Sequence, residues 1–229
     1  MLSIVMPCYE EEKNLKILLP DIKKNIHGID YEILIIDTTK RLDKTDQIAK
    51  INKVKYFNRI PDNSYGSAIR TGISKAKGNL ILFMDADGSH DPSYIPKLLK
   101  YVDEYDVVSA SRYIPGGKTD NTLILNLMSI ILNKSYTFIL GIPMKDVSNS
   151  MKIYKSEDLK KLNLISNNFD IIEEIIIKLI SYKDCKIKEI PFYFKKRNEG
   201  VTKRNLIKFI FSYISTIYRL WRFKKNSKK

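Results

Sequence analysis

The chain has 229 residues, of which 44% are hydrophobic, and its 40 basic and 26 acidic side chains give a formal net charge of +14. This length and hydrophobic content suit one well-buried α/β domain and exclude a wholly disordered chain. The positive charge predicts a polyanionic partner such as nucleic acid, anionic lipid or a phosphate-bearing substrate.

Two further features of the composition concern the cellular compartment. The two cysteines, Cys8 and Cys185, are far apart in the sequence, so a disulfide framework is not expected and a reducing compartment is. The N-terminal residues MLSIVMPCYEEE lack the basic segment and the long apolar core of a signal peptide. They are interpreted as a first strand, and a cytoplasmic protein is predicted.

Short apolar runs alternate with helical periods through the first half of the chain. Buried strands are expected at residues 2–6, 31–37, 54–57, 79–84 and 106–110, and helices at about 15–26 and 67–77. Strands that are apolar on both faces and separated by helices are typical of a parallel sheet covered on each side. The predicted fold class is α/β, a Rossmann-like and mostly parallel sheet flanked by helices.

The second half contains two long apolar segments, at residues 122–140 and 205–223, and a further helical period at 169–181. Polar side chains interrupt both long segments, whereas a transmembrane span needs about 20 nearly uninterrupted apolar residues, so neither is expected to cross a membrane. The last segment precedes a basic tail and is expected to form an amphipathic helix on an anionic membrane surface. A helix packed on the domain is the alternative.

Two carboxylates stand one residue apart in Asp85-Ala86-Asp87, directly after the most apolar strand. Ligands of open α/β sheets bind beyond the carboxyl ends of the strands, where residues 7–11 and Asp37 also fall. Mg²⁺ and Mn²⁺ prefer carboxylate oxygens and often complete their coordination with substrate phosphates. The pattern predicts a divalent ion beside a phosphate-bearing ligand, and the alternative is a polar loop that merely begins with two aspartates.

Five short blocks follow one another along the chain: residues 7–12 (PCYEEE), 63–72 (NSYGSAIRTG), 85–92 (DADGSHDP), 111–113 (SRY) with Gly116-Gly117, and Arg197-x-x-Gly200-x-Thr202-Lys203. In this order they resemble the family-two glycosyltransferases of GT-A fold, and within them the dolichol-phosphate mannose synthase group. The resemblance implies a GT-A domain over residues 1–204, with a nucleotide-sugar and metal half at 1–115 and an acceptor half at 116–204. Residues 205–229 would then be the membrane-surface helix and basic tail.

The resemblance also implies roles for individual residues. Nucleotide-sugar contacts are expected from Pro7, Tyr9, Glu11, Ile36, Asp37, Asp85, Ala86, Asp87, Arg112, Arg197 and Lys203. The metal ligands would be Asp85 and Asp87, with Ser89 as a further ligand. The expected catalytic residues are Asp87, Arg112 and Glu174.

Each of these side chains also has a plainer interpretation. Tyr9 could be a packed aromatic, Arg112 could pair with a structural carboxylate such as Asp106, and Glu174 could lie on a solvated helix face. His90 could act as a base, but we expect a structural loop residue.

The chain also departs from the family's pattern. Glu10 stands for the usual Asn, and Thr38 for a second Asp. Residues 146–152 read DVSNSMK where the family tends to have Asp-Pro-Thr-Ser-Gly-Phe-Arg, and Asn126 lies near a position that is usually basic. The departures leave the nucleotide and the acceptor open.

The resemblance implies an inverting transfer of a hexose from GDP-mannose or a UDP-sugar to polyprenyl or dolichyl phosphate at the cytoplasmic face of a membrane. A lipid phosphate needs no general base, because its second pKa is about 6. A glycan or cell-surface polymer hydroxyl would need one, with Glu174 as the candidate. A non-catalytic nucleotide- or nucleic-acid-binding module is the third possibility, against which Asp85 and Asp87 argue, and no nucleic acid is expected.

Overall fold

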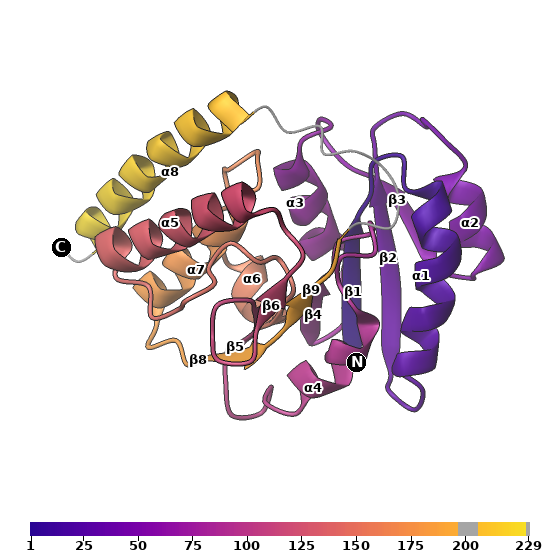
Figure 1. Ribbon diagram of the computed structural model, residues 1–229. Coiled ribbons are helices and arrows are strands. Elements are labelled where there is room, and N and C mark those ends of the chain that lie inside the picture. Colours follow the sequence, from indigo (N-terminus) through magenta and orange to yellow (C-terminus); the bar gives the residue numbers. More distant parts are fainter. Residues whose placement is uncertain (197–205, 228–229) are drawn as a thin grey trace.

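A seven-stranded sheet forms the centre of the protein (Figure 1). The computed structural model describes residues 1–196 and 206–227, with side chains up to residue 196 and over 213–226. The strand order is β3 (Lys55–Asn58), β2 (Tyr31–Asp37), β1 (Leu2–Pro7), β4 (Leu80–Phe83), β7 (Lys152–Lys155), β5 (Val107–Ser111) and β8 (Ile187–Pro191). Neighbours are parallel except that β7 runs antiparallel to β4 and β5. The predicted α/β class with a mostly parallel sheet is confirmed.

Helices cover both faces of this sheet. They are α1 (Glu12–Asn25), α2 (Thr45–Ile51), α3 (Tyr65–Lys75), α4 (Ile95–Leu99), α5 (Leu123–Leu140), α6 (Ser156–Lys160), α7 (Ile171–Tyr182) and α8 (Leu206–Ser227), with a 3₁₀ turn at Pro92–Tyr94. In Figure 1, α5 and α8 run side by side, and both the α5–α8 and the α7–α8 pairs are in contact. A second, small sheet pairs β6 (Lys118–Thr119) with β9 (Tyr193–Phe194).

The strand β1 shows why the apolar runs are continuous. Ile4 and Met6 belong to the core cluster that includes α1 and α4, whereas Val5 belongs to the cluster that includes α3 and α7. The helix α3 lies so close that a Cβ on Gly72 would be 2.2 Å from Val5 Cγ1. Both faces of the strand are therefore buried, and the helix against one of them requires glycine at this position.

The parallel order β2-β1-β4 places three strand ends at one edge of the sheet. Pro7 pairs with Ile36 in the register, Asp37 is the last residue of β2, and Asp85 follows β4. These are positions that the sequence predicts for a ligand site, because parallel strands point their carboxyl ends the same way.

Arg59 is a buried side chain that connects the loops at this edge of the sheet. It is 3% exposed and directly follows β3. Its guanidinium donates to five backbone carbonyls, those of Cys8, Ile36 (3.2 Å), Asp37 (3.1 Å), Asn63 (3.2 Å) and Ser64 (3.3 Å). Burial lowers the pKa of Arg59. A single side chain therefore connects the loops that follow β1, β2 and β3.

Replacing Arg59 with leucine should leave those carbonyls buried without donors. We expect the free energy of unfolding to fall by about 3 kcal/mol, measured by urea denaturation. The matched control is Arg41→Leu, since Arg41 is 51% exposed and should change stability by less than about 0.5 kcal/mol. Similar effects of the two substitutions would contradict the proposed role of Arg59.

Two further buried ionisable side chains lie between β7 and α7. The side chains of Lys152 and Glu173 are both 0% exposed. Lys152 Nζ donates to the carbonyls of Val147 (3.0 Å) and Asn149, whereas in the described part of the chain nothing donates to either carboxylate oxygen of Glu173. Burial raises the pKa of Glu173 to about 8 and lowers the pKa of Lys152. Its burial and the lack of a donor to either oxygen therefore favour the neutral acid form of Glu173 in the folded protein.

This neutral acid should make stability fall as the pH rises. In the unfolded chain Glu173 ionises near pH 4.5, as an ordinary glutamate does, whereas in the folded protein it keeps its proton up to about pH 8. Between these values the unfolded state has released a proton that the folded state holds, so the free energy of unfolding decreases. Glu173→Gln should remove this contribution, and its Tm should fall less than the wild-type Tm between about pH 5 and pH 8.

Thermal melts followed by circular dichroism measure the difference. Glu157→Gln, at a site where the side chain is 76% exposed, is the control and should follow the wild-type curve. Parallel Tm curves for wild type and Glu173→Gln would show that Glu173 ionises normally in the fold.

Candidate functional site

The two predicted metal carboxylates lie in the turn after β4, and each is held by a serine. Asp85 Oδ1 accepts a hydrogen bond from Ser150 Oγ at 3.0 Å, and its side chain is 26% exposed. Asp87 Oδ1 accepts from the backbone N–H of Ser89 at 3.0 Å and from Ser89 Oγ at 2.5 Å. Ser89 thus orients Asp87; its role as a further metal ligand stays a prediction.

His90 supports Asp85 from within the protein. Its Nδ1 accepts the backbone N–H of Asp85 at 3.0 Å, and its Nε2 lies 3.7 Å from Asp85 Oδ2. The ring is fully buried, edge-on to Phe192 and Phe194 with centroids 5.7 Å away in each case. Its burial and its bond to the backbone that carries the first carboxylate agree with the interpretation of His90 as a structural loop residue, which stays a prediction.

The donor set of this turn fits a hard divalent cation. Asp85 and Asp87 supply carboxylate oxygens, with serine hydroxyls beside them. Within residues 1–196 and the described part of α8, no cluster of three or more His, Cys, Asp or Glu side chains suits a metal. Two carboxylates without further protein ligands are typical of Mg²⁺ sites completed by water and substrate phosphates.

The predicted nucleotide side of the site is formed by the ends of β1 and β2. Asp37 is 2% exposed and accepts from the backbone N–H of Thr38 at 2.8 Å and from Tyr56 OH at 3.0 Å, and its burial raises its pKa. Pro7 and Ile36 pair across the same strand ends. Glu11 accepts from Asn14 Nδ2 at 2.6 Å. Pro7 and Ile36, which are both predicted to contact the nucleotide, therefore lie at the same edge of the sheet as Asp37.

The other two predicted contacts on this side differ in exposure. Tyr9 is 45% exposed, so it is not a buried core aromatic. Ala86 is 2% exposed and its side chain belongs to the apolar core, so its expected contact with the nucleotide sugar stays a prediction.

Arg112 follows β5 and is paired with Asp146. Its Nε lies 2.8 Å from Asp146 Oδ2 and its Nη2 lies 2.7 Å from Asp146 Oδ1, and its backbone N–H donates to the same carboxylate at 2.8 Å. Burial disfavours the charged guanidinium, but the adjacent Asp146 charge outweighs it, so the pKa of Arg112 is raised. The alternative named above, a structural carboxylate, is right in kind; the partner is Asp146, while Asp106 pairs with Lys183 at 2.7 Å.

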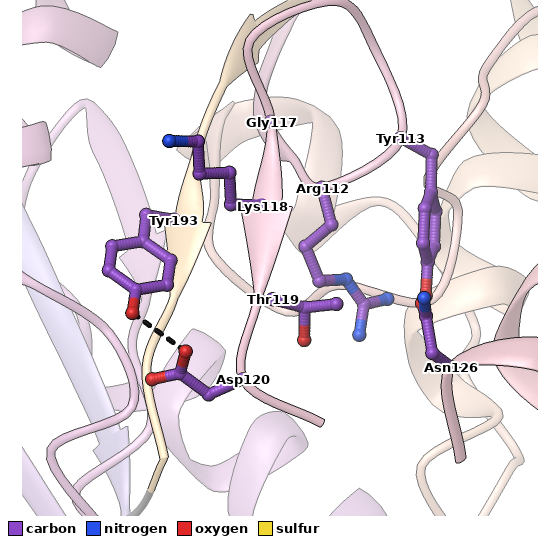
Figure 2. Close-up of a pocket in the computed structure, with 8 residues that line it drawn as sticks. All are labelled: Arg112, Tyr113, Gly117, Lys118, Thr119, Asp120, Asn126 and Tyr193. Carbon is purple, nitrogen blue, oxygen red and sulfur yellow. Dashed lines mark hydrogen bonds between the residues drawn. The ribbon is translucent and has the colours of Figure 1, made fainter. Parts of the chain in front are cut away.

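Arg112 also lines a pocket of about 530 Å³ beside the N-terminal end of α5 (Figure 2). The other lining residues are Tyr113, Gly117, Lys118, Thr119, Asp120, Asn126 and Tyr193. Gly117 packs against the backbone of Arg112, where a Cβ would be 2.6 Å from the Arg112 carbonyl carbon. Gly117, one of the two glycines predicted as part of a motif, therefore has a packing reason, and it lines the pocket next to the guanidinium.

The loop at residues 146–150 connects the two parts of the site. Asp146 and Ser148 hold Arg112, with Arg112 Nη2 3.0 Å from Ser148 Oγ, and Ser150 holds Asp85. Sequence reasoning treated this loop as a departure from the family's pattern and missed these contacts. A carboxylate and two serines within five residues is the signal that could have pointed to them. Sequence reasoning also missed Arg59, for which the only signal was its position directly after a predicted strand.

Glu174 is a buried side chain on α7. It is 0% exposed, and its carboxylate accepts from the backbone N–H groups of Ile165 (3.1 Å) and Ser166 (2.8 Å) and pairs with Lys178 at 2.7 Å. Burial alone would raise its pKa, but the Lys178 bond and these N–H groups lower it. The solvated helix face is wrong, and its catalytic role stays a prediction. The predicted phosphate contacts Arg197 and Lys203 lie outside the described residues.

Several apolar side chains of α5 and α8 are exposed to solvent. On α5 they include Leu123 (88%), Ile124 (71%), Leu127 (59%) and Phe138 (91%), and on α8 Ile214 (60%), Tyr218 (59%) and Trp221 (42%). α8 also packs on the domain through buried Tyr213 and Leu220. One described helix, α5, is long and apolar enough to cross a membrane by length and composition, and 17% of it is buried.

The sequence pattern of the glycosyl transferase family 2 matches residues 3–162. A dolichol-phosphate mannosyltransferase of Pyrococcus furiosus is 30% identical over 230 residues, covering 95% of this chain and 63% of that protein. A dolichol-phosphate mannosyltransferase of Saccharomyces cerevisiae is 26% identical, covering 97% of this chain and 87% of its own length. The chain thus spans less than two thirds of the Pyrococcus protein.

Solved structures resemble the fold at low sequence identity. Glucosyl-3-phosphoglycerate synthase from Mycobacterium tuberculosis, crystallised with Mn²⁺, uridine diphosphate and glucosyl-3-phosphoglycerate, superposes with a TM-score of 0.74 at 16% identity, covering 96% of this chain and 79% of that one. The same enzyme with Mg²⁺ and uridine diphosphate also gives 0.74. These structures establish the GT-A fold, and the sequence match over residues 3–162 shows that the chain belongs to glycosyl transferase family 2.

Proposed function

We propose that this protein is a metal-dependent glycosyltransferase that moves a hexose from a nucleoside diphosphate sugar, GDP-mannose or a UDP-sugar, to a polyprenyl phosphate at the cytoplasmic face of a membrane. The observation that carries the proposal is the loop at residues 146–150, which joins a two-carboxylate turn to a cationic pocket beside an exposed apolar helix. The names of the Pyrococcus and yeast relatives support a dolichol-type phosphate as acceptor.

The donor would bind across the ends of β1, β2 and β4. Pro7, Tyr9, Glu11, Ile36 and Asp37 would frame the base and ribose, and Asp85 and Asp87 would hold a Mg²⁺ or Mn²⁺ ion beside the diphosphate. Such an ion supplies positive charge against the negative charge that develops on the leaving diphosphate. The protein's own part is to fix the two carboxylates, which Ser150, Ser89 and His90 do.

The acceptor would enter the pocket that Arg112 and Lys118 line. A phosphate oxygen would attack the anomeric carbon from the side opposite the diphosphate, so one C–O bond forms as the other breaks and the configuration inverts. The charged guanidinium suits phosphate oxygens. Positioning of this kind needs no proton transfer, because a lipid phosphate is already anionic at neutral pH.

Asp120 in the pocket wall and Glu174, the general base expected for a hydroxyl acceptor, are both poor candidates for that role. Asp120, in the pocket wall, accepts from Tyr193 OH at 2.7 Å and from the backbone N–H of Lys196 at 3.1 Å, and the Tyr193 bond first and then the Lys196 bond lower its pKa. Glu174 is buried and bound by backbone N–H groups. A glycan hydroxyl acceptor would require one of them to accept a proton. A phosphate acceptor is therefore favoured over a hydroxyl.

Membrane attachment would use α5 and α8 together. Both helices expose apolar side chains, and α8 also carries exposed Arg222 and Lys225. Apolar residues next to basic ones are typical of helices that lie in the headgroup layer of an anionic bilayer. The basic tail after residue 227 would add to this attraction.

Asp85→Asn and Asp87→Asn should each abolish most of the transfer. Purified protein is incubated with short-chain polyprenyl phosphate, a panel of labelled nucleotide sugars, and Mn²⁺, Mg²⁺ or EDTA. We expect label in an organic-soluble, acid-labile product with metal and none with EDTA. Each variant should lose about a hundredfold or more in kcat/KM, because the carboxylates hold the charge that stabilises the leaving group.

Asp103→Asn, on an exposed side chain outside this turn, is the control and should retain activity. Label only in a glycan product would support a hydroxyl acceptor instead. Donor binding without turnover, unchanged by EDTA, would leave only a binding module.

Phe138→Glu and Trp221→Glu should weaken membrane binding. Cosedimentation with phosphatidylglycerol vesicles measures the partition coefficient, and each variant should lower it about tenfold, because a charge replaces an inserted aromatic ring. Ile51→Glu is the matched control: Ile51 is 75% exposed, on α2, far from α5 and α8 in Figure 1. Equal losses in all three variants, or none, would contradict attachment through α5 and α8.

A further inference from the structure

Asn133 is a buried amide on the inner face of α5, a helix with many exposed apolar side chains. The buried residues of α5 are Asn133, Tyr136 and Leu140, and Asn133 is 2% exposed. A buried amide that is not hydrogen-bonded is costly, so its position on the inner face requires specific partners.

Those partners belong to Ser148, in the loop that joins the two parts of the site. Asn133 Oδ1 accepts the backbone N–H of Ser148 at 3.0 Å, and Asn133 Nδ2 donates to Ser148 Oγ at 3.0 Å. Nδ2 also donates to the carbonyl of Ser129, one turn earlier in α5, at 2.8 Å. The amide therefore forms two hydrogen bonds with Ser148 and a third with the backbone of its own helix.

Ser148 is also hydrogen-bonded to Arg112, so its position affects that of the guanidinium. Arg112 Nη2 donates to Ser148 Oγ at 3.0 Å, and a guanidinium or an amide NH₂ group can only donate. The serine oxygen must therefore accept both bonds, which fixes its place between Asn133 and Arg112. The same Nη2 donates to Asp146, two residues earlier in the loop. The Arg112 fork is thus held on one side by Asp146 and on the other, through Ser148, by α5.

We propose that Asn133 is a positioning residue that sets the orientation of Arg112 toward the pocket through Ser148. Asn133 thereby fixes the position of the guanidinium relative to α5, the helix on which Leu127 and Phe138 are exposed. The part of this inference that concerns the acceptor rests on the proposed function; the part that concerns the orientation of Arg112 does not. Arg112 and Asn126, which is in the first turn of α5, both line the pocket, so the guanidinium and the helix border the space proposed for the acceptor (Figure 2).

Asn133→Ala and Ser148→Ala test the link from its two ends. Ser148→Ala is the milder change, because it removes only the hydroxyl and keeps the backbone N–H. The first readout is the Arg112 Nε–H signal in ¹⁵N–¹H NMR spectra, assigned by its loss in Arg112→Lys, and its exchange with water. We expect exchange to become about tenfold faster in both variants, since Ser148→Ala removes a charge-assisted hydrogen bond from the fork and Asn133→Ala removes the two bonds that hold its acceptor, Ser148, in place.

The second readout is kinetic. The KM for short-chain polyprenyl phosphate should rise about tenfold in both variants, while the KM for the nucleotide sugar should change less than about twofold. The double variant should be no worse than Asn133→Ala alone, because both changes remove one link. Ser135→Ala is the control, at a partly exposed position of α5 whose hydroxyl donates to the Ile131 carbonyl at 2.9 Å, and it should match the wild type in both readouts.

An unchanged Arg112 signal in Asn133→Ala and Ser148→Ala would overturn the inference. So would a loss of thermal stability that raises both KM values equally, since that is what a merely structural residue would produce. If the wild type transfers no sugar to lipid phosphate, the proposed function fails, and the NMR exchange alone then decides whether Asn133 positions Arg112.

Discussion

The buried ion pair between Arg112 and Asp146 is the contact on which the site depends. Removing two charges from water is costly unless the geometry is bidentate and the remaining donors are bonded, and here the fork, the backbone N–H and Ser148 meet these conditions. Asp146 is held in turn, because its backbone N–H and that of Lys145 donate to Glu189 on β8. The loop that begins at Asp146 therefore has a fixed path.

That path explains how two separate segments of the chain act at one place. The carboxylate turn follows β4, and the pocket is lined by residues that follow β5, together with Tyr193. Between β4 and β5 lies β7, the one antiparallel strand of the sheet, and the loop that leads into it reaches both neighbours. Ser150 contacts Asp85 on one side, and Ser148 contacts Arg112 on the other. The buried Lys152 ammonium group donates hydrogen bonds to two carbonyls of this loop, those of Val147 and Asn149.

The parts of the fold that could be predicted from sequence are those whose burial leaves a simple pattern. The strands of the first half are apolar on both faces, and the structure has each within one residue of its expected bounds. β7 was not predictable, because Lys152 and Lys155 interrupt its apolar character and Lys152 is buried only through carbonyls of its own loop. The position of Asp85 followed from the strand end. The hydrogen bond that it accepts from Ser150, 65 residues later, is a tertiary contact that no local sequence pattern predicts.

Sequence reasoning located α5 and α8 but not the faces that they expose. The apolar composition of α5 is compatible with a core helix, and its exposure arises because the sheet is already covered by α3 and α7. Glu174 shows the reverse case, in which a carboxylate that resembled a site residue is buried and holds a loop.

The central claim is that Asp85 and Asp87 hold a divalent ion against the diphosphate of a nucleotide sugar. Electron paramagnetic resonance of Mn²⁺ with a nucleoside diphosphate labelled with ¹⁷O on its phosphates tests this directly. The account predicts that the label broadens the Mn²⁺ lines in the wild-type protein and that the broadening disappears when both aspartates are replaced by asparagine. Broadening that is equal in the wild type and the double variant would contradict it.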